Sequence, residues 1–181
     1  MRLEGKSIVV TGASAGMGQA IVTRFVQEGA YVVAVARRKE RLEELAAELK
    51  DAPGKVIIYA GDVSNPAVCE GMIDLAVKEF GRLDVLVNNA GIMDDNTAVG
   101  DMSDEMMERM FKVNTYAPLY SMRKAIKVFL EQDDESGNII NVTSVGAVHQ
   151  TAGVAYCASK AAIASATKNT AFLRSRISIS K

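Results

Sequence analysis

The sequence predicts an α/β fold with a doubly wound, mostly parallel sheet and helices on both faces, in a single domain over residues 1–181. Three observations support this prediction. Short apolar runs alternate along the chain with segments of helical periodicity. The first four apolar runs are hydrophobic almost throughout, which is typical of parallel strands buried on both faces. The length of 181 residues is that of one ordinary domain.

The predicted elements follow from local signals. Asn65 followed by Pro66 is a good helix start, Ser103 is a plausible N-cap after a long loop, and Pro118 predicts a bend inside the helix that follows. Strands are expected at 6–12, 31–36, 55–63, 83–89 and 137–144, with 176–180 as a candidate sixth strand. Helices are expected at about 18–28, 38–50, 66–80, 104–130 and 155–173.

Composition excludes several classes of function. With 21 basic and 22 acidic side chains, the net charge is −1, which lacks the positive surplus of a nucleic-acid binder. The sequence has no run of about 18 apolar residues that could span a membrane, and its N-terminus has no signal-peptide pattern. We therefore expect a cytoplasmic protein. Cys69 and Cys157 lie far apart and His149 is the single histidine, so no metal site is expected.

A glycine-rich segment, Thr11–Gly18, lies between the first predicted strand and the first predicted helix. Glycines allow a tight turn and close approach to a ligand, and a helix N-terminus attracts a pyrophosphate. The spacing GxxxGxG differs from GxGxxG and from a P-loop, and a simple turn is the alternative reading. We interpret the segment as the dinucleotide-binding loop of a Rossmann-type fold, in which the expected cofactor contacts are Gly12, Ser14, Gly16, Met17 and Gly18.

The end of the second strand indicates which nicotinamide cofactor is bound. An acidic residue there usually holds the ribose 2′-hydroxyl, but this chain has Arg37 and Arg38 instead. Guanidinium groups match phosphate geometry, so the pair predicts NADP rather than NAD. The alternative is that both arginines are solvated residues at the start of the next helix. Asp62 and Val63, after the third strand, are placed to contact the adenine.

Two tyrosines have a lysine one helical turn later, Tyr156 with Lys160 and Tyr120 with Lys124. A nearby ammonium stabilises a phenolate, which makes such a tyrosine a usable proton donor and acceptor. Tyr156 follows the fifth strand, whose end carries Ser144, whereas Tyr120 lies deep in the long middle helix. Context therefore selects Tyr156, and Tyr120 is interpreted as a packing residue.

The chain resembles the short-chain dehydrogenase/reductase family over residues 5 to about 173. The matching residues occur in order on the expected elements: Thr11–Gly18, Asn88–Gly91, Asn114, Ser144 and Tyr156–Lys160. The resemblance implies an NAD(P)-dependent enzyme that interconverts a small-molecule carbonyl and an alcohol. It also implies a homodimer or homotetramer that associates through helices at about 104–130 and 155–173.

The resemblance implies a role for each matching residue. Tyr156 would be the acid/base, Lys160 would assist it and hold the nicotinamide ribose, and Ser144 would bind the substrate oxygen. Asn114 would hold a water that connects Lys160 to solvent. The sheet centre and the cofactor would be supported by Asn88, Ala90 and Gly91.

The family usually continues with a Pro-Gly turn, a substrate-covering segment, a strand and a helix, none of which these 181 residues contain. We therefore expect this 181-residue form to bind NADP(H) but to reduce carbonyls poorly or not at all. A non-catalytic NADP-binding remnant is the alternative function. A third reading, an S-adenosylmethionine-dependent methyltransferase, shares glycine-rich loops, but Arg37 and the set of Ser144, Tyr156 and Lys160 weigh against it.

Overall fold

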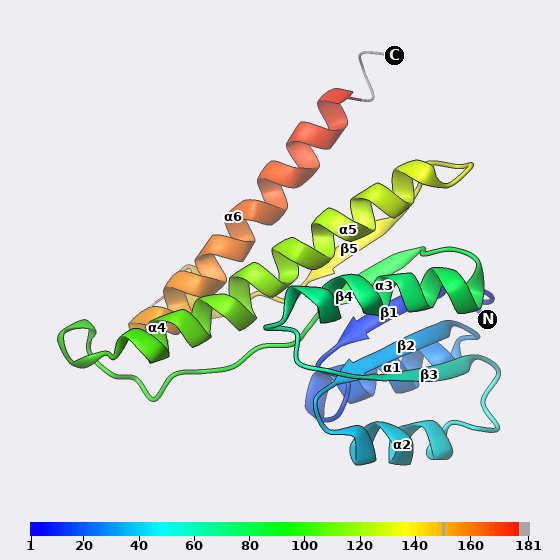
Figure 1. The fold of residues 1–181 in the computed structure, drawn as a ribbon, viewed down its shortest axis with the longest axis horizontal. Helices are drawn as coiled ribbons and strands as arrows, with labels where there is room; N and C mark the ends of the chain where they lie inside the picture. The colour runs from blue at the N-terminus through cyan, green and yellow to red at the C-terminus, as the bar shows by residue number, and fades with distance from the viewer. Residues whose placement is uncertain (150, 178–181) are drawn as a thin grey trace.

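A computed structural model describes residues 1–149 and 151–177 and contains one five-stranded sheet (Figure 1). All strand pairs are parallel, and the order across the sheet is β3-β2-β1-β4-β5. This architecture confirms the predicted doubly wound α/β fold. The strands are β1 (Ser7–Thr11), β2 (Tyr31–Ala36), β3 (Lys55–Ala60), β4 (Val85–Asn88) and β5 (Asn138–Asn141).

The helices lie between the strands at the predicted places. The Asn65 side chain caps one of them by accepting a hydrogen bond from the amide of Ala67 at 3.0 Å, and Ser103 caps another by accepting one from Met106 at 3.2 Å. The α-helices are α1 (Gly16–Gln27), α2 (Lys39–Glu48), α3 (Pro66–Phe80), α4 (Asp104–Phe111), α5 (Ala117–Glu131) and α6 (Val154–Ile177). Three shorter segments are η1 (Val99–Asp101), the π-helix η2 (Lys112–Tyr116) and η3 (Val145–Ala147).

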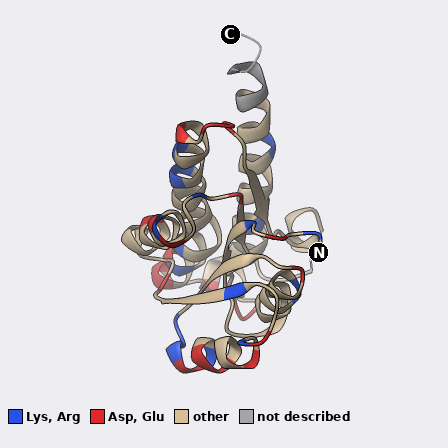
Figure 2. Cartoon of the chain, turned by 90° about the vertical axis from the view of Figure 1, so that its right-hand side faces the viewer, with Lys and Arg blue, Asp and Glu red and all other residues tan. Residues whose placement is uncertain are grey.

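The sheet has a hydrophobic core on each face. Successive residues of a strand point to opposite faces, so Val9 belongs to one core and its neighbours Ile8 and Val10 belong to the other. Helices α1 and α2 cover the face of Ile8 and Val10, and α3 and α5 cover the face of Val9. Charged side chains gather on the helices, most densely on α2 at the bottom of the view, while the strands are largely free of charge (Figure 2).

The long middle helix is interrupted rather than simply bent. Helix α4 ends at Phe111, the π-helix η2 follows, and α5 begins at Ala117. Pro118 has no N–H with which to bond the carbonyl of Asn114, and its ring would crowd that carbonyl in a regular helix. The wider turn of a π-helix relieves this conflict, and π segments often mark functional sites. The predicted bend is therefore present, and it lies just before Pro118.

The last helix is longer than the sequence predicts. Residues 176 and 177, the first two of the candidate sixth strand, continue α6, so the strand prediction is wrong for them. No glycine or proline occurs between 154 and 177 to stop the helix. Residues 178–180 of the candidate strand lie outside the described residues.

Neither a membrane span nor a metal cluster is present in the part of the chain that the structure describes. No helix there is long and apolar enough to cross a bilayer. No group of three or more His, Cys, Asp or Glu side chains is placed there to hold a metal ion.

Candidate functional site

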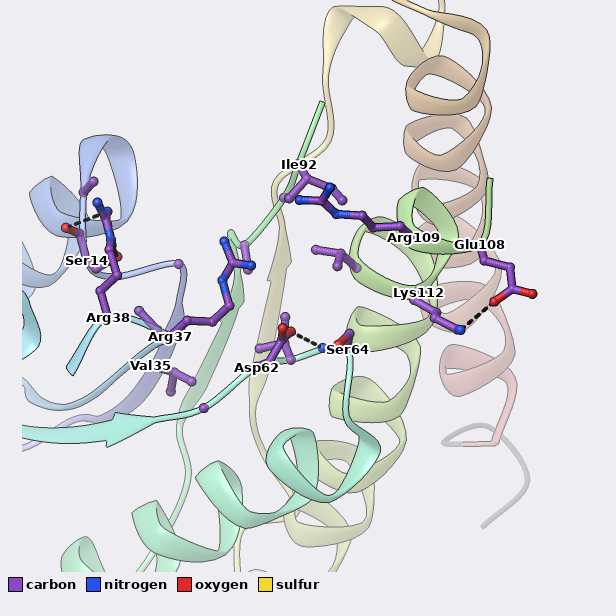
Figure 3. A pocket seen from close by; sticks show the side chains of 18 of the residues that line it. Ser14, Val35, Arg37, Arg38, Asp62, Ser64, Ile92, Glu108, Arg109 and Lys112 are labelled. Carbon is purple, nitrogen blue, oxygen red and sulfur yellow. Dashed lines mark hydrogen bonds and ion pairs between the residues drawn. The ribbon is translucent and has the colours of Figure 1, made fainter. Parts of the chain in front are cut away.

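A cavity of about 650 Å³ opens at the carboxyl ends of the strands, between the glycine-rich loop and α4 (Figure 3). This is the edge of a parallel sheet at which ligands bind. Eight of the predicted cofactor residues line it: Gly12, Ser14, Arg37, Arg38, Asp62, Val63, Ala90 and Gly91. The predicted residues that do not line it are Gly16, Met17, Gly18, Asn88, Tyr156 and Lys160.

The glycine-rich loop is crowded at two of its three glycines. Gly12 has φ +70°, and a Cβ there would lie 2.8 Å from Nδ2 of Asn89. A Cβ at Gly18 would lie 2.1 Å from the carbonyl oxygen of Gly12. Side chains at these two positions would push the loop off the start of α1. At Gly16, where φ is +56°, a Cβ would meet open space, which leaves room for a ligand at the N-terminus of α1.

The segment after β4 supports this loop from the neighbouring strand. The Thr11 hydroxyl accepts hydrogen bonds from the amides of Asn89 and Ala90, both at 3.0 Å. In return the Asn89 side chain donates to the Thr11 carbonyl at 3.0 Å. Asn88 points to the other side and donates to Oδ1 of Asn141 on β5 at 2.8 Å. Asn88 and Asn89 therefore lock three adjacent strands together at the edge where the cavity opens.

Arg37 and Arg38 differ in what they contact. The Arg38 guanidinium donates to the Ser14 hydroxyl at 3.1 Å, which fixes it over the glycine-rich loop. The Arg37 side chain extends toward the cavity (Figure 3), and it has no ion pair or hydrogen bond with any residue that the structure describes. Asp62 is oriented by the amide of Ser64, which donates to it at 2.9 Å. An unpaired guanidinium beside an ordered carboxylate fits a phosphorylated ribose with its adenine, so the residues present fit NADP.

Helix α4 and the segment after it supply a wall of the cavity that the sequence analysis missed. Arg109 and Val113 lie four residues apart and therefore on one side of the helical segment, and both line the cavity together with Lys112. Lys112 is paired with Glu108 at 2.7 Å, whereas Arg109 has no partner in the described ranges. The sequence contained a signal for this wall. Val113 directly precedes Asn114, a predicted site residue, and Arg109 lies one helical turn before Val113.

Lys160 is buried at the junction of β4, β5 and α6. Its ammonium donates to the carbonyl of Val142 at 2.9 Å, and only 5% of the residue is exposed. Burial lowers the pKa of Lys160, because removal from water disfavours the charged form. A Cβ at Gly91 would lie 3.1 Å from Nζ of Lys160 and 3.3 Å from Oδ1 of Asn114. A glycine at position 91 therefore lets both side chains approach the backbone after β4.

The Asn114 amide holds that backbone in place. Its Oδ1 accepts from the amide of Ile92 and its Nδ2 donates to the carbonyl of Ile92, both at 2.9 Å. Nδ2 also donates to the Ser159 hydroxyl at 3.1 Å, which was not singled out from the sequence. Asn114 is 1% exposed. The side chain thus joins η2, the loop after β4 and helix α6.

Ser144 and Tyr156 come from the two ends of one connection. Ser144 follows β5 and caps η3 by accepting a hydrogen bond from the amide of Gly146 at 3.0 Å. Tyr156 is half-buried in the first turn of α6, and its hydroxyl bonds no other residue among those described. Segment η3 packs against α6, and a Cβ at Gly146 would lie 3.3 Å from Sγ of Cys157.

The other tyrosine–lysine pair, Tyr120 and Lys124, makes packing and ion-pair contacts. Lys124 is bonded to Asp74 of α3 at 2.6 Å, and Tyr120 packs on the core under α3 and α5 with Arg123 over its ring at 5.3 Å. The interpretation of Tyr120 as a packing residue is therefore confirmed.

Comparison with known proteins agrees with this arrangement. The sequence profile of the family described as short chain dehydrogenase matches residues 6–180. The chain belongs to the short-chain dehydrogenase family. This assignment confirms the resemblance carried by Thr11–Gly18, Asn88–Gly91 and Tyr156–Lys160, and it makes the chain a member of a family of oxidoreductases.

The relatives include enzymes that are named for different activities. The chain is 42% identical over 172 residues to 3beta-hydroxysteroid dehydrogenase 2 of Eggerthella lenta, which covers 94% of this chain and 66% of the relative. It is 37% identical over 169 residues to the 3-oxoacyl-[acyl-carrier-protein] reductase FabG of Thermotoga maritima, covering 93% of this chain and 68% of that protein. The chain thus spans about two thirds of the length of these relatives.

Solved structures show the same fold. A short chain dehydrogenase from Mycobacterium smegmatis is 34% identical, with a TM-score of 0.88 over 94% of this chain and 72% of that one. A short chain dehydrogenase from Burkholderia cenocepacia in complex with NADP is 30% identical, with a TM-score of 0.85 over 94% of this chain and 69% of that one.

The buried ammonium of Lys160 predicts a pH dependence of stability. Its pKa is lower in the folded chain than the ordinary 10.5, so the unfolded chain binds more protons between the two values. The contribution of Lys160 to the free energy of unfolding should therefore rise with pH in that window, and Lys160→Met should lack this rise. Urea unfolding of both proteins from pH 7 to 10.5 measures it, and a constant difference in stability between them would contradict the prediction.

Proposed function

We propose that this chain carries the nucleotide-binding and reacting groups of an NADP(H)-dependent oxidoreductase that interconverts a carbonyl and an alcohol. One observation carries the proposal. A cavity with an unpaired Arg37 and the buried Lys160 beside Tyr156 lie at the same edge of the sheet, joined by the loop after β4. The loop residue Gly91 lines the cavity, and a Cβ at its position would lie 3.1 Å from Nζ of Lys160.

The reacting groups have complementary tasks. When bound, NADPH supplies the hydride that adds to the carbonyl carbon of the substrate. Negative charge then develops on the carbonyl oxygen, where the hydroxyls of Ser144 and Tyr156 donate hydrogen bonds, and Tyr156 transfers its proton. The Lys160 ammonium stabilises the phenolate that remains on Tyr156. The reverse sequence, with Tyr156 as the base, oxidises an alcohol.

Two arginines support NADP as the cofactor. We assign Arg37 to the 2′-phosphate because its guanidinium is unpaired and faces the cavity. Arg38, fixed by Ser14, adds a second positive charge at the same strand end. The Burkholderia relative, of the same fold, is described in complex with NADP.

The preference predicts the outcome of a charge reversal. Arg37→Asp should weaken NADPH binding by at least about tenfold, because a charge-assisted hydrogen bond of about 1.5–3 kcal/mol is lost and a repulsion is added. NADH binding should be retained or improved. Titration of nicotinamide fluorescence with both cofactors measures this.

Arg41→Asp is the matched control, since Arg41 is exposed on α2, pairs with Glu44 at 3.0 Å and does not line the cavity. It should leave both affinities unchanged. Equal affinity of the unmodified protein for NADPH and NADH would contradict the assignment of Arg37.

An uncharged substrate fits the surroundings of Ser144 and Tyr156. The connection between them, residues 143–156, contains no Asp, Glu, Lys or Arg. Val145 and Val148 are 67% and 74% exposed beside Ser144. We therefore favour an apolar carbonyl or secondary alcohol over an anionic one, which agrees with the name of the Eggerthella hydroxysteroid dehydrogenase.

The two tyrosine–lysine pairs provide a decisive comparison. Where the protein turns over any member of a panel of apolar ketones and secondary alcohols, Tyr156→Phe should reduce that turnover by about 100- to 10,000-fold, because the proton donor is lost. NADPH affinity should stay close to that of the unmodified protein. Tyr120→Phe should leave turnover largely unchanged. The reverse pattern would assign the chemistry to the other pair, and NADPH binding without turnover of any substrate would favour a non-catalytic NADP-binding protein.

We also propose that the chain forms a homodimer or homotetramer through the helices after the long loop. Apolar side chains are exposed along their outer side: Met107 is 40% exposed, Tyr116 46% and Leu119 38%. Met107 and Tyr116 line one shallow groove with Phe111. An exposed apolar surface of this kind suits a two-fold interface between copies of the chain.

A charge placed on this surface should separate the copies. Leu119→Glu should lower the mass measured by light scattering to that of the 19.4 kDa monomer, because a carboxylate would be buried between the copies. Val99→Glu is the control, since Val99 is 69% exposed in η1 and is not part of the proposed surface. A monomer mass for the unmodified protein would contradict the proposed association.

A further inference from the structure

The carboxylate of Asp94 lies against the first turn of the helix that carries Tyr156 and Lys160. Its Oδ2 accepts a hydrogen bond from the backbone amide of Tyr156 at 2.9 Å. Asp94 is 9% exposed, and its Oδ1 has no hydrogen-bond partner among the described residues. Burial of a carboxylate with one unpaired oxygen costs free energy, so the presence of Asp94 at this place needs a physical explanation.

Gly153 leaves the space that the carboxylate fills. A Cβ at Gly153 would lie 2.1 Å from Oδ1 and 2.3 Å from Oδ2 of Asp94. Gly153 is not among the glycines with positive φ, so this crowding, and not the backbone conformation, opposes a side chain there. The carboxylate thus rests directly on the start of α6, where the helix dipole favours a negative charge.

The other backbone group of Tyr156 is held from the same side. The Ser159 hydroxyl donates to the carbonyl of Tyr156 at 2.8 Å and accepts a hydrogen bond from Asn114 at 3.1 Å. Asn114 in turn binds both backbone groups of Ile92, two residues before Asp94. The loop after β4 therefore contacts the amide of Tyr156 through Asp94 and its carbonyl through the chain of Asn114 and Ser159.

We propose that Asp94 is a positioning residue for Tyr156, which fixes the first turn of α6 so that the phenol stays in reach of Ser144 and of the cofactor. The proposal rests on the proposed function, since it concerns the orientation of the proton donor. Asp94 acts through the backbone of Tyr156 and takes no part in proton transfer. Residues 92–94 then join the nucleotide cavity to the proton donor.

Two independent changes should disturb the same contact. Asp94→Ala removes the carboxylate, and Gly153→Ala displaces it with a methyl group while Asp94 remains. Asp94→Asn keeps an acceptor oxygen for the Tyr156 amide and should retain most of the positioning. Asp95→Ala and Gly100→Ala are the matched controls, because Asp95 is exposed and bonded to Thr97, and a Cβ at Gly100 meets nothing within 4 Å.

Fluorine NMR of protein labelled with 3-fluorotyrosine reads the phenol directly and needs no turnover. The chain has five tyrosines, and Tyr156→Phe assigns the resonance of Tyr156. In Asp94→Ala and in Gly153→Ala this resonance should shift and broaden, while the other four stay in place. The four unchanged resonances show that the chain remains folded. An unchanged Tyr156 resonance in both variants would overturn the proposal.

Cofactor and turnover measurements separate this inference from the proposed function. In the unmodified protein NADP⁺ should move the Tyr156 resonance; failure of that response alone counts against the proposed function, because the spectra of the free variants still test Asp94. Where a ketone is reduced, kcat should fall by about tenfold or more in Asp94→Ala and Gly153→Ala, since misplacement of a reacting group is costly. The NADPH dissociation constant and both control variants should be unaffected, and equal losses in the controls would overturn the proposal.

Discussion

The hydrogen bonds between the Asn114 amide and the backbone of Ile92 are the contacts on which the site depends. After β4 ends at Asn88, the chain leaves the sheet, and the partly buried Ile92 has no strand partner among the residues that the structure describes. Buried backbone groups must be bonded, and a side-chain amide is one of the few groups that can serve both an N–H and a C=O. The π-helix caused by the conflict with Pro118 presents Asn114 at that place. A regular helix through position 114 would turn the amide to another side.

Close backbone approach is the second constraint, and it joins the two halves of the site. Gly12 and Gly18 let the glycine-rich loop pack on itself, and Gly91 lets Lys160 reach the backbone after β4. The same loop therefore borders the nucleotide cavity on one side and the buried ammonium on the other. Polar side chains fix this loop at Thr11 and at Asn114, so the same contacts hold the cavity wall and the surroundings of Lys160.

Local signals predicted most of the fold. The valine-rich run at 31–36 matches β2, and Asn65 with Pro66 marks the start of α3, because both signals act over a few residues. The contact of Asp94 with Tyr156 was not predicted, because it joins residues 62 positions apart in the chain. The end of α6 was missed for a different reason. The serine- and isoleucine-rich segment suits a strand locally, but no breaking residue separates it from the preceding helix.

The placement of two buried opposite charges explains how Lys160 keeps its charge available. Asp94 and Lys160 both lie near Tyr156. An ion pair between them would neutralise the positive charge of Lys160 with the carboxylate. The structure keeps them apart: Asp94 is bonded to the amide of Tyr156, and Lys160 is bonded to the carbonyl of Val142. Among the described residues Lys160 has no carboxylate partner, and burial alone lowers its pKa. In the reaction proposed above, the ammonium would then be available to stabilise a phenolate on Tyr156, one helical turn away.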